Sequence, residues 1–146
     1  MRDTPFAGEA EIAQIATRFR DLSLPKAEWT HAAHFSTALW LVMRCPDVLP
    51  ERDMPGMIRR YNASVGGVNS DTSGYHETIT QASLRAVRAF ADCVSPAMPV
   101  DQVHAALMAG PCGEKDWLLA HWSRDRLMSV AARHGWVEPD LAPFPH

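Results

Sequence analysis

The segment that decides the fold is WTHAAHFSTALWLVMRCP, residues 29–46. At about 100° per residue, its apolar side chains gather on one broad arc of a helix, formed by Phe35, Ala38, Leu39, Leu41 and Val42. Thr30 is a residue type that caps helix N-termini, and Pro46 cannot continue a helix. The pattern therefore predicts a helix that begins at Thr30 and ends at Arg44.

The rest of the chain repeats this pattern of helical periodicity interrupted by proline and glycine. We expect further helices, the last of them broken or divided at Ser123, within residues 8–25, 56–67, 75–94, 99–110 and 114–135. Residues 47–55 read as a connector, and the proline-rich residues 136–146 as an extended tail pinned by Trp136, Leu141 and Phe144. No segment alternates as a strand would. The prediction is an all-α, compact single-domain bundle of five to seven helices over residues 1–146.

Composition limits the classes of function. The chain has 146 residues, 47% of them hydrophobic and 21% charged, with a formal net charge of -3. This balance gives no basic surface for nucleic acid or an anionic membrane, and no apolar run approaches the roughly 18 residues of a membrane span. The N-terminus lacks a signal-peptide pattern, and Cys45, Cys93 and Cys112 are odd in number and far apart. We expect free thiols and a cytoplasmic protein, with self-association left open.

Two histidines of the first helix lie where apolar side chains are expected. His31 and His34 fall inside the apolar arc and are neighbours on the helix surface, with Cβ atoms about 5–6 Å apart. His76, at the start of the helix over 75–94, lies at the edge of that helix's buried stripe. Neutral imidazoles bind transition metals, so His31, His34 and His76 are candidate ligands of zinc, nickel or iron.

Two other interpretations of these histidines stay open. They could line a metal-free polar pocket for a small molecule, or they could be satisfied by buried hydrogen bonds alone. Glu77 is a candidate general base or ligand, although a carboxylate in a first turn after a Gly74 cap also complements the helix dipole. Tyr75 beside it is a second candidate catalytic residue.

The segment GGVNSDTSG, residues 66–74, delivers polar groups to the start of the helix that carries His76. Free N–H groups at such a terminus suit an anion or a carbonyl, so Asn69 and Thr72 are candidate contacts to a cofactor or ligand. The alternative is a loop held by its own Asx and hydroxyl turns. The chain has no G-K-[ST] sequence and therefore no P-loop.

Three segments together resemble a family of small bacterial helical proteins. They are EWTHAAHFSTALW, RYNASVGGVNSDTSGYHETIT and SRDRLMSVAARHGWVEPDLAP, which match W-[TN]-H-x-x-H, G-Y-H-E-T-[IL]-T and S-R-[ED]-R-L followed by G-W-V. The matching positions are His31, His34, Gly74, Tyr75, His76, Glu77, Thr78, Ser123, Arg124 and Arg126. The resemblance covers most of the chain from Trp29 to Pro143 and implies no particular activity. Helical bundles of the DinB type, in which three histidines hold a divalent metal, are a looser analogy.

The sequence thus predicts a histidine-lined site between helices. Its leading interpretation is a small metal-dependent enzyme of the hydrolase, lyase or oxygenase type, in which the metal activates water or dioxygen. The alternatives are a non-catalytic module that binds a small molecule in a metal-free pocket, or a structural or interaction domain.

Overall fold

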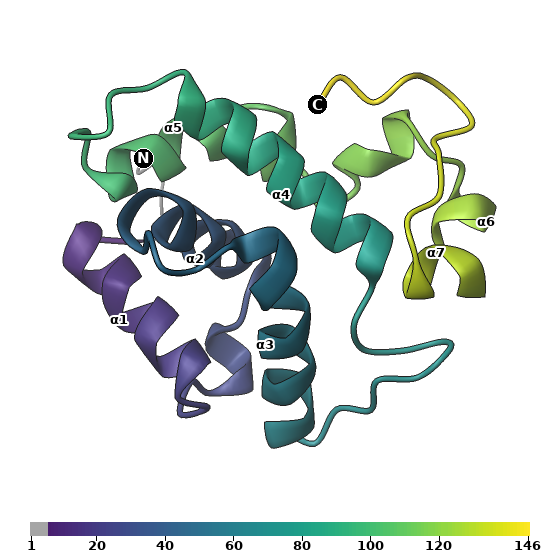
Figure 1. Ribbon diagram of the computed structural model, residues 1–146, viewed down its shortest axis with the longest axis horizontal. Coiled ribbons are helices and arrows are strands. Elements are labelled where there is room, and N and C mark those ends of the chain that lie inside the picture. The colour runs from purple at the N-terminus through teal and green to yellow at the C-terminus, as the bar shows by residue number, and fades with distance from the viewer. Residues whose placement is uncertain (1–5) are drawn as a thin grey trace.

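The computed structural model describes residues 6–146 and confirms the predicted all-α class, with no strand in this range. Within this range, seven α-helices and three short 3-10 helices follow one another (Figure 1). They are α1 (Glu9–Arg20), η1 (Lys26–Glu28), α2 (His31–Arg44), α3 (Pro50–Ser64), α4 (Glu77–Asp92), α5 (Val100–Met108), η2 (Pro111–Gly113), η3 (Trp117–Ala120), α6 (Arg124–Leu127) and α7 (Val130–His134).

The main hydrophobic core surrounds α2, which packs against α1, α4 and α5. Phe35, Leu39 and Leu41 of α2 are buried in it, as the apolar arc predicts. Thr30 accepts a hydrogen bond from the Ala33 amide at 3.1 Å, which confirms the predicted N-cap of this helix. The helix that decides the fold is thus also the helix around which the core is built.

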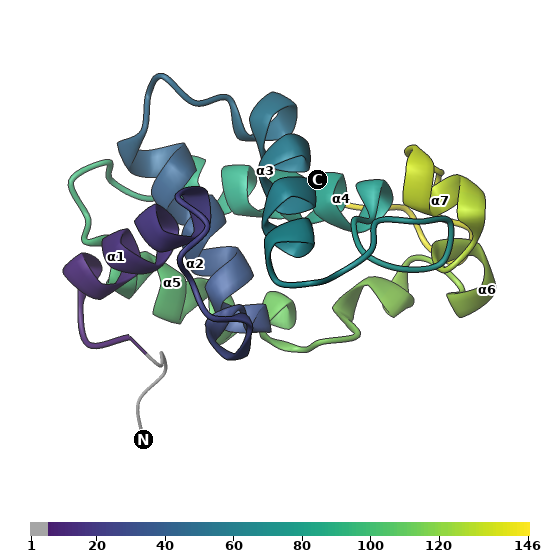
Figure 2. The ribbon, with the colours of Figure 1, turned by 90° about the horizontal axis from the view of Figure 1, so that it is seen from below.

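A second, smaller core forms where the C-terminal third of the chain meets the first half of α4. Its buried members are Ala82, Leu118, Trp122 and Leu127. Figures 1 and 2 show α6 and α7 at one end of the molecule, α1 and α5 at the other, and α4 running between them. Because Leu84 and Val87 of α4 belong to the main core, this one helix takes part in both clusters.

Helix α3 begins earlier than the sequence predicts. Residues 50–55 were expected in a connector, yet α3 starts at Pro50 and continues through Pro55. Pro50 suits a first helical position. Pro55 has no N–H and cannot bond the Glu51 carbonyl one turn before it. The Gln81 side chain of α4 donates to that freed carbonyl at 3.0 Å, so the helix continues and gains a contact with α4.

Residues 136–146 form neither helix nor strand. Trp136 and Phe144 pack against the second core, as predicted. Leu141 does not, because its side chain is 60% exposed; its backbone N–H instead donates to the His121 carbonyl at 2.9 Å. Within the described residues, no helix has both the length and the apolar character that crossing a membrane requires.

Candidate functional site

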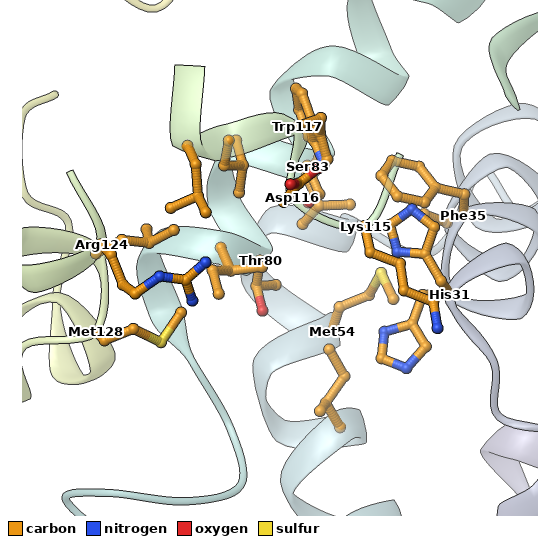
Figure 3. A pocket seen from close by; sticks show the side chains of 18 residues that line it. His31, Phe35, Met54, Thr80, Ser83, Lys115, Asp116, Trp117, Arg124 and Met128 are labelled. Carbon is orange, nitrogen blue, oxygen red and sulfur yellow. The ribbon is translucent and has the colours of Figure 1, made fainter. Parts of the chain in front are cut away.

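A cavity of about 260 Å³ lies between the two hydrophobic cores. Its walls come from α2, α3, α4 and the segment from Lys115 to Met128 (Figure 3). Most of the lining is apolar and includes Phe35, Ala38, Met54, Ile58, Leu84 and Leu118. Few side chains on the wall are polar, and these are the groups that could form hydrogen bonds or ion pairs with a bound molecule.

His31 lines the cavity from the first turn of α2. Its Nε2 lies 2.7 Å from the backbone oxygen of Cys112. A carbonyl oxygen only accepts hydrogen bonds, so Nε2 carries the proton. In the neutral ring, Nδ1 is then an unprotonated acceptor. The Cys112 carbonyl thus fixes both the orientation and the tautomer of His31, as supporting groups do for functional histidines.

His34 lines the same cavity and is an exposed residue, one face of whose ring is covered by Trp29. Its imidazole stacks on the Trp29 indole with 4.0 Å between ring centroids, and Phe19 stacks on Trp29 at 4.3 Å. Desolvation, and secondly the nearby His31, lowers the pKa of His34 to about 4. The ring is therefore neutral at pH 7, which is the form that accepts a hydrogen bond or binds a metal.

The remaining polar groups on the wall come from α4 and from the C-terminal segment. Thr80 and Ser83 contribute hydroxyls, and Lys115, Asp116 and Arg124 contribute charges. Figure 3 shows the Arg124 side chain extending toward Thr80, whereas His31 and Phe35 lie at the opposite end of the cavity. These five residues are not among the site residues predicted from the sequence. Arg124 could have been noticed, because it belongs to the S-R-D-R-L segment.

His76 does not line the cavity; it is the N-cap of α4. Its Nδ1 accepts from the Ile79 amide at 3.1 Å, and its Nε2 donates to the Leu127 carbonyl at 2.6 Å. The expected Gly74 cap and Tyr75 helix start are therefore wrong by two residues, because the imidazole itself satisfies the helix N-terminus. Burial, the largest influence, lowers the pKa of His76.

The structure brings together two of the three predicted metal ligands. His31 and His34 share the cavity wall, whereas both ring nitrogens of His76 are used in hydrogen bonds elsewhere. In residues 6–146, no group of three or more histidine, cysteine or carboxylate side chains is placed to hold a metal ion. A zinc, nickel or iron site at all three histidines stays a prediction, and it would require His76 to leave both partners.

Tyr75 and Glu77, the predicted catalytic pair, contact each other outside the cavity lining. The Tyr75 hydroxyl donates to Glu77 Oε1 at 2.5 Å, and the Arg59 guanidinium carbon lies 4.3 Å from the centre of the Tyr75 ring. Burial, followed by the hydrogen bond to Glu77, raises the pKa of Tyr75, so the phenol stays protonated at pH 7. Their catalytic role stays a prediction; the observed role is to fix the start of α4.

Asn69 and Thr72 lie in the loop before α4, away from the cavity lining. Asn69 Oδ1 accepts from Asn62 Nδ2 at 3.1 Å and from the Tyr75 amide at 3.0 Å, and its Nδ2 donates to the Arg59 carbonyl at 3.0 Å. Thr72 is exposed, and its amide donates to Ser70 Oγ at 3.3 Å. Asn69 thus ties the loop to α3 and to Tyr75, whereas Thr72 takes part in a turn within the loop. Cofactor binding at either residue stays a prediction.

The G-Y-H-E-T segment joins the main body to the C-terminal segment. Besides the His76–Leu127 contact, the carbonyls of Gly74 and Tyr75 accept from Arg133 Nη1 at 3.0 and 3.3 Å. The Thr78 hydroxyl donates to the Gly135 carbonyl at 2.8 Å and accepts from the Val137 amide at 3.2 Å. These bonds hold in place the segment that supplies one wall of the cavity.

Comparison of the chain with protein-family models, curated proteins and solved structures finds no match. The resemblance to a family of small bacterial helical proteins therefore stays a prediction.

Proposed function

We propose that this protein binds a small, largely apolar organic molecule in the cavity between its two hydrophobic cores. The observation that carries the proposal is the cavity itself, about 260 Å³ with walls that are mostly apolar and a few polar groups that converge on it. Apolar lining with a few placed polar groups is the usual composition of ligand sites. The volume lies just below the usual range of about 300–1,000 Å³, which favours a small ligand.

The neutral state of His34 and the hydrogen bond of His31 support binding by hydrogen bonds at this end of the cavity. His34 is neutral at pH 7 because its pKa is lowered to about 4. The Nε2 proton of His31 is committed to the Cys112 carbonyl. In the neutral ring, the nitrogen left for a ligand is an acceptor. A bound hydroxyl or N–H group could donate to it.

Because of the position of the cavity, a bound ligand should also change the stability of the protein. Its wall combines Phe35 and Ile58 of the main core with Leu118 and Leu127 of the second core. A molecule that contacts both cores binds the folded state and not the separated parts, so it raises the free energy of unfolding by mass action.

The test uses two neutral probes, 1-octanol and indole, in titrations followed by amide chemical shifts. We expect saturable shifts confined to residues around the cavity, and a rise in melting temperature at saturating probe. Ser83→Phe places a ring in the cavity and should abolish both effects, because Ser83 is on the wall. Thr17→Phe, on the exposed face of α1, is the matched control. Shifts that spread over the whole surface, or that Ser83→Phe leaves unchanged, would contradict the proposal.

A second candidate, a metal-dependent enzyme, is supported by the pairing of His31 and His34 on one cavity wall. Imidazoles three residues apart on one helix are spaced to share an ion, and a bound substrate or water could complete its coordination. Elemental analysis would compare the native protein with the His31→Ala/His34→Ala double variant, after exposure of both to zinc, nickel and iron(II). One equivalent of metal in the native protein alone would favour this candidate, and equal low content in both would reject it. His146→Ala, at the exposed C-terminus, is the control.

A further inference from the structure

We propose that the natural ligand of the cavity is an amphiphilic acid, whose carboxylate is held by Arg124 and whose apolar part lies toward Phe35. This inference rests on the proposed function, because it names the chemical class of the molecule that the cavity binds. Three features of the cavity support it: its charges, the fixed backbone that carries one of them, and the apolar wall beyond that charge.

The charges on the cavity wall are predominantly positive. Arg124 and Lys115 contribute two cations and Asp116 one anion. Within residues 6–146, neither cation has a hydrogen-bonded or ion-pair partner. Arg126, two residues from Arg124, differs in this respect, because its Nε donates to the Glu138 carbonyl at 2.6 Å. Arg126 thus joins α6 to the segment that follows α7, whereas Arg124 is exposed at the wall of the cavity.

The backbone that carries Arg124 is held in place. The amide and the hydroxyl of Ser123 donate to the two carboxylate oxygens of Asp140 at 2.7 and 2.6 Å. Ser123 also caps α6 by accepting from the Arg126 amide. The hydrogen bond from His76 to Leu127 fixes the other end of the same helix. A guanidinium on a fixed backbone loses less freedom on binding, so more of its interaction energy appears as affinity.

Most of the cavity wall beyond Arg124 is apolar, which suits the rest of such a molecule. Arg124 extends toward Thr80 at one end, whereas Phe35 lies at the other end together with His31 and Lys115 (Figure 3). A guanidinium matches a carboxylate with two parallel hydrogen bonds, which an ammonium cannot do. A single guanidinium on a wall that also carries the carboxylate of Asp116 favours a monoanion over a more highly charged phosphate.

The experiment compares two acids with their uncharged amides: octanoate with octanamide, and 3-phenylpropionate with 3-phenylpropanamide. Dissociation constants at pH 7 come from amide chemical-shift titrations of the full chain. We expect at least one acid to bind about tenfold more tightly than its amide. The pair with the larger ratio identifies the apolar part as a straight chain or an aromatic ring.

Variants assign the preference to Arg124. Arg124→Gln should weaken the preferred acid about tenfold or more and leave its amide unchanged, because a charge-assisted pair is lost. Arg124→Lys should retain part of the preference. Arg20→Gln, an exposed residue of α1, removes the same charge away from the cavity and should change neither constant. Unchanged melting temperatures would show that the variants fold.

Three results would overturn the inference. If acids and amides bind the cavity equally, the ligand class is wrong while the proposed function stands. The same holds if Arg124→Gln leaves the preference intact. If no acid, amide or neutral probe binds, both the proposed function and the ligand class fail.

Discussion

The Nε2 atom of His76 lies 2.6 Å from the backbone oxygen of Leu127, where the start of α4 meets the end of α6. The other ring nitrogen accepts from the Ile79 amide and caps α4. One buried side chain therefore caps the N-terminus of α4 and also holds the C-terminal end of α6. Because Leu127 is part of the cavity wall, the shape of the cavity depends on this contact.

Removal of the His76 imidazole should destabilise the protein. His76→Ala removes the N-cap and leaves the Leu127 carbonyl without its partner, and we expect a loss of about 2–4 kcal/mol in the free energy of unfolding. His76→Asn should recover part of the loss, because asparagine also caps helices. Urea unfolding measures both variants. Equal losses in the two would mean that the cap contributes nothing.

Stability should fall in mild acid. The pKa of His76 is lowered, and that of His34 is lowered from 6.5 to about 4. Between about pH 6.5 and 4 the unfolded chain therefore binds protons that the folded protein does not, so the free energy of unfolding decreases as pH decreases. Urea titrations at several pH values in this window should show the decrease, and His34→Gln should make it smaller. An unchanged slope in His34→Gln would contradict this assignment, and His146→Gln is the control.

Gly74 should not tolerate a side chain. Its φ is +78°, and a Cβ there would lie 2.6 Å from both Asn69 Oδ1 and the Val68 carbonyl oxygen. Gly74→Ala should therefore cost about 1–3 kcal/mol. Gly56, inside α3, meets only the flexible end of Arg60 at 3.3 Å, so Gly56→Ala should stabilise the helix by up to about 1 kcal/mol. Thermal unfolding of the pair tests both signs, and a stabilising Gly74→Ala would show that the loop adopts another conformation.

Two buried threonines should respond oppositely to the same substitution. The Thr78 hydroxyl bonds both Gly135 and Val137, whereas the buried Thr37 hydroxyl has no hydrogen-bond partner within residues 6–146. Thr78→Val should therefore cost about 1–3 kcal/mol, while Thr37→Val should be neutral or stabilising. Chemical denaturation of the two variants decides this. A loss at Thr37 as large as that at Thr78 would show that an unseen partner, such as a water molecule, satisfies it.

Local sequence signals predicted the fold well wherever a single segment carries the information. The apolar arc of residues 29–46 correctly predicted α2 and its Thr30 cap. As expected, Ser123 caps the start of α6 and Gly135 caps the end of α7. The signals failed where a distant residue takes part. Proline at position 55 argued against a helix, and only the Gln81 side chain, 26 positions later, satisfies the carbonyl that Pro55 leaves free.

The site was predictable only in part for the same reason. Placing His31 and His34 on one arc of the helix agrees with their shared position on the cavity wall, although His34 is exposed rather than buried. His76 faces inward, but its partner is a backbone carbonyl 51 residues away, and helical periodicity contains no information about such a contact. Arg124 and Lys115 reach the cavity through the path of the chain after α5, which includes no long helix and therefore gives little periodic signal.

The sharing of α4 between two hydrophobic cores has a consequence for how the molecule opens. Ala82 packs with Trp122 in the second core, whereas Val87, five residues later, packs in the main core. The C-terminal segment can therefore detach as a cooperative unit while α1, α2, α3 and α5 stay folded. Its amide hydrogens should exchange with solvent earlier than those of α2. Such an opening would separate the two sides of the cavity, so a molecule that contacts both cores should slow this exchange.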